Sequence, residues 1–140
     1  MKEFIKSLDG IYCRLATTEH GIGVIAIRDI PANTNPFEQM YMGEFIPIDV
    51  SEIEKQPEGI QKMIKDFCPL QEGQYYVPED GLGCIDVSFY LNHSFSPNMR
   101  CEKEGLDFFT IRDIKEGEQL TVDYMTYSND GDEEFIKNIN

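Results

Sequence analysis

The stretch Leu91-Asn92-His93-Ser94-Phe95-Ser96-Pro97-Asn98 is the most informative segment of this sequence. It combines amide, imidazole and hydroxyl side chains with a proline, and these residue types favour turns over regular structure. Apolar Tyr90 precedes the stretch and Met99 follows it, which predicts that the turn lies inside the protein. Because buried polar side chains are nearly always hydrogen-bonded, this segment is expected to hold either a ligand or another piece of backbone.

A second informative stretch is Gly117-Glu118-Gln119-Leu120-Thr121-Val122-Asp123-Tyr124. It begins as a turn and continues as a strand-like run that ends on a tyrosine.

Composition and charge limit the classes of function. A chain of 140 residues with 41% apolar residues predicts one globular domain with its own core. A net charge of −14 disfavours direct binding to nucleic acid or to an anionic membrane, because phosphate groups would be repelled. It favours a basic partner such as a Lys-rich peptide, although solubility alone would also explain the charge.

The cysteines and the N-terminal segment indicate the cellular compartment. No Cys-x-x-Cys pair is present, and the cysteines and histidines have no zinc-ligand spacing, so no metal site is predicted. Charged residues interrupt the apolar run around Phe4 and Ile5, which predicts neither a signal peptide nor a membrane span. We therefore expect an intracellular protein, cytoplasmic or nuclear and not secreted, with reduced thiols at Cys13, Cys68, Cys84 and Cys101.

The hydrophobic pattern predicts a mostly β protein with irregular connections. Strands are expected over residues 11–16, 24–27, 37–42, 75–77, 84–87, 106–111 and 119–124. The main helix is expected over 58–67, where the apolar residues share one face. Ser51 and Glu54 have the spacing of a helix-capping box, and Pro57 would interrupt a helix there.

One short internal repeat is present. Residues 26–31, Ala-Ile-Arg-Asp-Ile-Pro, correspond in type at nearly every position to residues 110–115, Thr-Ile-Arg-Asp-Ile-Lys. Two copies are too few for a solenoid, but they predict two similar β units packed together.

Four segments in order resemble the SET domain of protein-lysine methyltransferases. They are 21–30 with its Gly-x-Gly, 41–46 with Tyr-x-Gly-Glu, 92–98 with Asn-His-Ser-x-x-Pro-Asn, and 108–124 ending in Asp-Tyr. The resemblance covers about residues 10–128, so we expect a single SET domain over 1–140 with an acidic tail at 129–140. It implies a β-clip-like fold of several small curved sheets, one or two short helices and a C-terminal pseudoknot.

The resemblance also implies an activity, transfer of a methyl group from S-adenosylmethionine to a lysine ε-amine. Tyr124 matches the catalytic tyrosine, which also contacts the cofactor. Asn92 and His93 match a pair that contacts the amino-acid and adenine ends of the cofactor. Gly21, Ile22 and Gly23 match a segment whose backbone faces the cofactor. Tyr41, Tyr90 and Val122 match positions that line the lysine channel. At position 122 this chain has valine, whereas relatives usually carry Phe or Tyr.

Departures from the family pattern leave other functions open. The Gly-Asn-x-x-Arg that often precedes Asn-His-Ser is missing, and no cysteine cluster supplies a zinc-bound flanking module, leaving Tyr127 or Phe135 as the available aromatic wall. The expected partner is a histone tail or another Lys-rich protein, and a homodimer stays open. The alternative is a SET-fold module that binds a lysine peptide or cofactor but turns over poorly. A dinucleotide enzyme, suggested by Gly21 to Gly23, fails because no βαβ unit follows.

Overall fold

Strands dominate the computed structural model, which describes residues 10–37, 43–102 and 107–127. The strands are β1 Cys13–Thr18, β2 Gly21–Ala26, β3 Phe45–Asp49, β4 Leu70–Gln71, β5 Gln74–Pro78, β6 Asn92–His93, β7 Met99–Glu102, β8 Asp107–Thr110 and β9 Gln119–Val122. The α-helices are α2 Val50–Ile53 and α3 Glu58–Phe67, and the 3₁₀ helices are η1 Leu82–Cys84, η2 Val87–Tyr90 and η4 Tyr124–Thr126. The prediction of a mostly β fold is confirmed.

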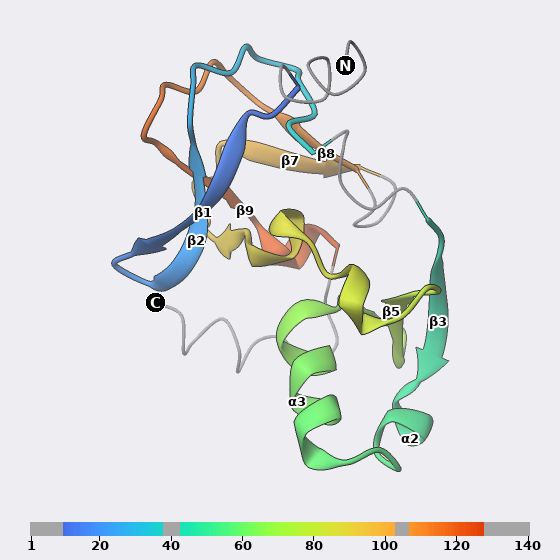
Figure 1. Cartoon of the computed structure of the whole chain (residues 1–140). Helices are drawn as coiled ribbons and strands as arrows, with labels where there is room; N and C mark the ends of the chain where they lie inside the picture. Colours follow the sequence, from blue (N-terminus) through green and yellow to red (C-terminus); the bar gives the residue numbers. More distant parts are fainter. Residues whose placement is uncertain (1–9, 38–42, 103–106, 128–140) are drawn as a thin grey trace, which may run out of the picture.

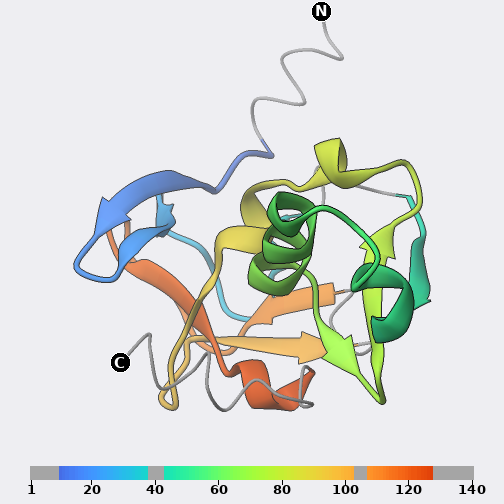
Figure 2. The same ribbon diagram turned by 90° about the horizontal axis from the view of Figure 1, so that it is seen from below.

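The strands form three small sheets rather than one large one. Their orders are β1-β2-β9-β6, β3-β5-β4 and β7-β8. All pairs are antiparallel except β6 and β9, which run parallel and bring residues 92–93 beside residues 121–122. The hairpin of β1 and β2 lies on one side of the molecule and β3 with β5 on the other, in both Figure 1 and Figure 2.

Two apolar clusters hold these sheets together. The larger joins the β1-β2-β9-β6 sheet to β7 and β8, and its most buried members are Val24, Ala26, Ile30, Leu91, Met99, Ile114, Leu120 and Val122. The smaller lies where α3 packs on the β3-β5-β4 sheet and contains Ile53, Ile64, Cys68, Leu70, Tyr75 and Val77. Leu91 and Met99, on either side of the polar segment 92–98, both belong to the first cluster, so that cluster fixes the position of the segment.

The predicted helix over 58–67 is confirmed to the residue as α3. Ile64 is buried and Met63 and Phe67 are half-buried, whereas Ile60 stays exposed at the start of the helix. The predicted capping box is wrong. The helix begins at Val50 with Asp49 as its N-cap, so Ser51 lies inside the first turn.

The strand predicted over 84–87 is also wrong. Cys84 ends η1 and Val87 begins η2, and the Asp86 side chain accepts a hydrogen bond from the Ser88 N–H at 2.9 Å. This local side-chain bond competes with strand pairing, as short polar side chains often do. Of the strand predicted over 37–42, Phe37 lies in a turn and the rest falls outside the described residues.

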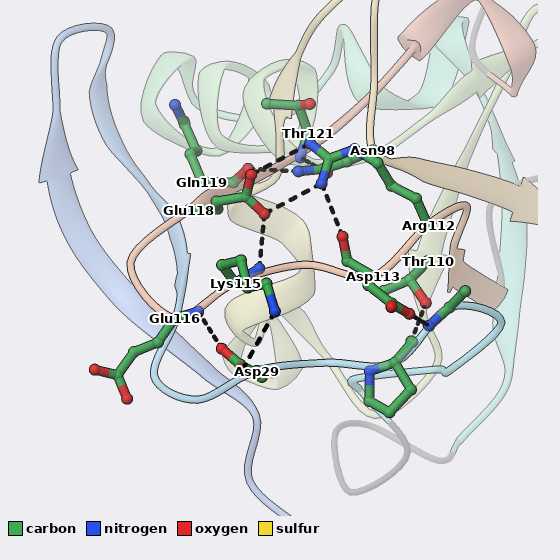
Figure 3. Close-up of polar contacts among 12 residues, drawn as sticks. Asp29, Asn98, Thr110, Arg112, Asp113, Lys115, Glu116, Glu118, Gln119 and Thr121 are labelled. Atoms are coloured by element: carbon green, nitrogen blue, oxygen red, sulfur yellow. Dashed lines mark hydrogen bonds and ion pairs between the residues drawn. The ribbon is translucent and has the colours of Figure 1, made fainter.

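As the internal repeat predicts, the two similar units pack together. Ile30 and Ile114 form an antiparallel bridge in which each N–H donates to the other's carbonyl at 2.8 Å. Asp29 Oδ1 accepts from the Glu116 N–H, and Asp113 Oδ1 accepts from the Ala32 N–H, both at 2.9 Å (Figure 3). The contacts are therefore reciprocal, as a local twofold axis would make them.

The reciprocity extends to the flanking backbone. The Gly117 N–H donates to the Ala26 carbonyl at 2.8 Å, and the Asn33 N–H donates to the Thr110 carbonyl at 2.9 Å. Both turns use a positive φ, 59° at Asn33 and 92° at Gly117, which asparagine and glycine tolerate best. The two halves of the repeat therefore join β2 to β9 and β8 to the loop after Pro31.

Candidate functional site

The candidate site is built around β9, which lies between β2 and β6. The register pairs Gln119 with Ile25 of β2, and it pairs Thr121 and Val122 with Asn92 and His93 of β6. Because side chains alternate across a strand, Asn92 shares the outer face with Gln119 and Thr121. His93 shares the buried face with Val122.

Asn98 extends this pairing with its side chain. Its Nδ2 donates to the Gln119 carbonyl at 2.8 Å, and its Oδ1 accepts from the Thr121 N–H at 2.9 Å (Figure 3). The side-chain amide thus takes the place of a strand residue beside β9, and Asn98 is buried. The expectation that this polar segment binds another piece of backbone is confirmed, and the pairing brings together the two segments that a pseudoknot requires.

Tyr124 follows β9 and is anchored twice to the segment 91–93. Its N–H donates to His93 Nδ1 at 3.1 Å, and its hydroxyl donates to the Leu91 carbonyl. The Tyr124 and His93 rings have centroids 5.3 Å apart. The structure therefore brings Tyr124 to the Asn92-His93 pair, although it lies 31 residues after His93 in the chain.

His93 is held as a neutral imidazole. Its side chain is fully buried, and Nδ1 accepts a hydrogen bond, so the ring proton belongs on Nε2. Burial lowers the pKa of His93 below 6.5, and the Asp123 carboxylate, 3.7 Å from Nδ1, opposes that shift only in part. Since the ring is neutral, the contact with Asp123 is not an ion pair. Nε2 is buried and has no hydrogen-bond partner in the part of the chain that the structure describes.

Gly23 lies against polar side chains in the middle of the sheet. A Cβ at this position would lie 2.7 Å from both Asn92 Nδ2 and Gln119 Oε1, which is too close. Gly21 differs, because nothing lies within 4 Å of a Cβ there, and its φ of 97° is what favours glycine. The glycines are thus part of strand β2 and its turn, and Gly23 provides room for Asn92.

Two exposed apolar side chains flank the predicted cofactor pair. Phe95 is 67% exposed, and its ring lies edge-on to His93 with centroids 4.3 Å apart. Ile22 is 56% exposed and offers its carbonyl to Asn92 Nδ2 at 3.4 Å. They are the two most exposed of the large hydrophobic residues described, and both adjoin the same polar pair.

The predicted channel residues have different positions. Val122 is buried opposite His93, and Tyr90 is half-buried with its ring 4.9 Å from Phe67. Tyr41 and Phe135 lie outside the described residues. The Tyr127 ring packs edge-on against the rings of Phe108 and Tyr124, with ring centroids 5.6 Å and 6.1 Å away, so it helps to hold the Tyr124 ring in place.

Two groups that contribute to the candidate site were not predicted from the sequence. The carbonyl of Leu91 holds the Tyr124 hydroxyl, and a backbone group leaves no signal in the residue type. Gln119 accepts from Asn92 Nδ2 at 2.8 Å. Its position two residues before Thr121, on the same face of a predicted strand, was the available signal.

The described ranges contain neither a metal cluster nor a membrane helix. No group of three or more His, Cys, Asp or Glu side chains there is arranged to hold a metal ion. None of the helices in these ranges combines the length and the hydrophobicity that a membrane span requires.

Comparison with known proteins identifies relatives. A family model for the SET domain matches residues 21–125. The chain is 33% identical over 121 residues to "Histone-lysine N-methyltransferase, H3 lysine-9 specific" of Schizosaccharomyces pombe, covering 77% of this chain and 24% of that protein. It is 33% identical over 75 residues to "Histone-lysine N-methyltransferase Su(var)3-9" of Drosophila melanogaster, covering 46% of this chain and 12% of that protein.

A plant protein gives a similar match. The "Putative histone-lysine N-methyltransferase ASHH4" of Arabidopsis thaliana is 34% identical over 118 residues, which is 79% of this chain and 32% of that protein. The chain therefore spans a third or less of each of these three relatives.

Proposed function

This chain belongs to the SET-domain family, and we propose that it transfers methyl groups from S-adenosylmethionine to the ε-amine of a lysine in a protein substrate. The observation that carries the proposal is the double anchoring of Tyr124 by the segment 91–93. A tyrosine fixed at its backbone and at its hydroxyl is positioned for a task that needs precise alignment of the reacting groups.

The hydroxyl of Tyr124 would act as an acceptor toward the substrate. Its proton is donated to the Leu91 carbonyl, so its oxygen presents lone pairs. A neutral lysine amine would donate an N–H to that oxygen, which leaves the nitrogen lone pair available for bond formation. The same oxygen would stabilise the positive charge that develops on the nitrogen.

The residues present fit S-adenosylmethionine. When bound, it supplies a methyl group activated by a sulfonium. Asn92 and His93 would hold it, since His93 has a buried Nε2 without a partner in the described chain. The exposed side chains of Phe95 and Ile22 would offer apolar surface to the adenine base.

The proposed substrate class follows from the net charge of the chain and from the names of its relatives. A net charge of −14 would attract a Lys-rich segment and raise its association rate. The relatives are named as histone-lysine methyltransferases, so we propose a histone tail or a similarly basic intracellular protein as the substrate.

The test is transfer of labelled methyl from S-adenosylmethionine to core histones and to a set of basic proteins. Tyr124→Phe, which removes only the hydroxyl, is expected to lower the rate by roughly a hundredfold. Tyr76→Phe, which alters a tyrosine in the β3-β5-β4 sheet, is the matched control and should keep the rate.

Calorimetry with S-adenosylmethionine separates the outcomes. Binding without transfer to any substrate would favour the non-catalytic binding module, and equal rates for wild type and Tyr124→Phe would remove the role of the tyrosine. Absence of binding would overturn the proposed function.

A further inference from the structure

The unit formed by α3 and the β3-β5-β4 sheet, which holds the smaller apolar cluster, contacts the candidate site. Phe67 of α3 lies against Tyr90, with ring centroids 4.9 Å apart. Gln71 of β4 donates a hydrogen bond from Nε2 to the Tyr127 carbonyl. This unit therefore touches both of the chain segments that build the site, one ahead of Leu91 and one after η4.

The geometry of β4 explains why Gln71 points away from the smaller cluster. Leu70, the other residue of this strand, is buried in that cluster, so the Gln71 side chain lies on the opposite face. The register pairs Gln71 with Gln74, which leaves Glu72 and Gly73 as a two-residue turn. Both turn residues have positive φ, 51° and 76°, as the type I′ turns of β-hairpins require. The turn thereby fixes the position of Gln71.

The bond from Gln71 acts on the residue that ends η4. Its acceptor is a backbone carbonyl, which cannot donate, so the amide must present its nitrogen. Tyr127 is the C-cap of η4, and its N–H donates to the Tyr124 carbonyl at 3.2 Å. The Tyr127 ring also packs edge-on against the Tyr124 ring. A group that holds Tyr127 therefore restrains Tyr124 through both the backbone and the ring.

Tyr124 needs restraint on both sides because η4 is a single 3₁₀ turn, whose internal hydrogen bonds are weak. On the side of β9, the segment 91–93 fixes its N–H and its hydroxyl. On the other side, Phe108 packs against the Tyr127 ring and Gln71 bonds the Tyr127 carbonyl. The hydrogen bond from Gln71 is the directional contact of these two.

We infer that Gln71 is a positioning residue: by donating to the Tyr127 carbonyl it holds η4, so that the Tyr124 hydroxyl stays aligned with the reacting groups. The inference rests on the proposed function, because alignment of Tyr124 matters for the rate only if a methyl group is transferred. Gln71 acts through Tyr127 and is not itself a catalytic residue.

The test is steady-state kinetics of methyl transfer from S-adenosylmethionine to core histones and to the set of basic proteins. Gln71→Met keeps the length of the side chain and removes the donor. It is expected to lower kcat about tenfold, because the tyrosine is displaced from the reacting groups. KM for S-adenosylmethionine should not change, since the lost contact does not bind the cofactor. Gln71→Lys, which restores an N–H donor, should recover most of kcat.

Gln61→Met is the matched control. Gln61 Nε2 also donates to backbone carbonyls, those of Glu54 and Gln56 near the start of α3. Its replacement removes the same kind of hydrogen bond within the same unit but away from η4. The kinetic constants of this variant should equal those of the wild type.

Two measurements separate positioning from a general loss of stability. In a Tyr124→Phe background, Gln71→Met should change kcat by less than about twofold, because the hydroxyl that it positions is already absent. Hydrogen exchange followed by NMR should show faster exchange of the Tyr127 N–H in Gln71→Met and wild-type exchange in Gln61→Met.

The outcomes bear on different statements. A wild-type kcat in Gln71→Met, or the same tenfold loss in the Tyr124→Phe background, would overturn the positioning role. Unchanged exchange of the Tyr127 N–H would show that Gln71 does not hold η4, and would overturn it as well. Wild-type protein that transfers no methyl group to any of these proteins would instead overturn the proposed function, and with it this inference.

Discussion

His93 links the predicted cofactor segment to Tyr124 through one ring nitrogen. Nδ1 accepts the Tyr124 N–H only while the imidazole is neutral, and burial favours that neutral form. A proton on Nδ1 would remove the acceptor and place a charge in a fully buried ring. The state of this one residue therefore connects pH with both stability and the position of the tyrosine.

Stability should fall as the pH drops below about 6.5 because the pKa of His93 is lowered in the folded state. Above that pH the imidazole is neutral in both states and contributes no pH dependence. Below it the unfolded chain binds the proton more readily, so the free energy of unfolding decreases until the pH reaches the lowered pKa.

Urea denaturation between pH 7.5 and 5.5 measures this effect. His93→Asn, whose Oδ1 can still accept the Tyr124 N–H, should reduce the slope of stability against pH. His20→Asn, at an exposed histidine, should retain the wild-type slope. An unchanged slope in His93→Asn would contradict the assignment.

Asn98 is a second residue whose contribution to stability can be estimated. Asn98→Ala removes two hydrogen bonds at a buried position and leaves the Thr121 N–H without its acceptor. The expected loss is about 2–4 kcal/mol in the free energy of unfolding, measured by urea denaturation.

Asn98→Asp tests the direction of the two bonds. A carboxylate can still accept from the Thr121 N–H, but it faces the Gln119 carbonyl without a proton to donate. It should therefore also destabilise the protein. A change below about 0.5 kcal/mol in both variants would show that the side chain does not support β9.

At the scale of elements, the reciprocal repeat joins β2 to β9 and thereby places the site. Ile30 and Ile114 are buried at its centre, and Asp29 and Asp113 each accept a backbone N–H of the opposite unit. The end of β2 next to Gly117 is fixed by this motif, so the register that brings Gln119 opposite Ile25 depends on it.

The symmetry of this motif predicts matched effects. Asp29→Ala and Asp113→Ala should each lower the free energy of unfolding by about 0.5–1.5 kcal/mol, because each removes one acceptor of a backbone N–H at an exposed position. Asp29 also lies 3.8 Å from Lys115 Nζ, but an ion pair between two exposed side chains adds little. Asn at either position keeps an oxygen acceptor and should lose less. Thermal or urea denaturation of the four variants measures this, and a large effect at one aspartate with none at the other would contradict the reciprocity.

At the scale of the whole molecule, the two apolar clusters determine which thiols are reactive. Burial raises the pKa of Cys13 to about 12, with a smaller contribution from the nearby Asp86 carboxylate, and burial raises the pKa of Cys68 to about 12. Cys13 belongs to the larger cluster and Cys68 to the smaller one. Both thiols are therefore protonated and shielded at neutral pH.

Thiol labelling at pH 7.5 tests this arrangement. Cys84 and Cys101 are partly exposed and should react in the folded protein, whereas Cys13 and Cys68 should react only after unfolding. Mass spectrometry of the labelled peptides identifies the sites. Rapid labelling of Cys13 or Cys68 under native conditions would show that the corresponding cluster opens.

The sequence by itself determined the fold class, the helix α3 and the polar segments that build the site. It could do so because apolar periodicity and the preference of Asn, Ser and Pro for turns act over a few residues. Tertiary structure decided that 3₁₀ turns form over residues 82–84 and 87–90, which the apolar composition of 84–87 did not indicate. It also decided that the Asn92 side chain donates to Gln119 and that the Leu91 carbonyl holds the Tyr124 hydroxyl. These contacts join groups separated by 27 and 33 residues, and they exist because the parallel pairing of β6 with β9 brings the two segments together.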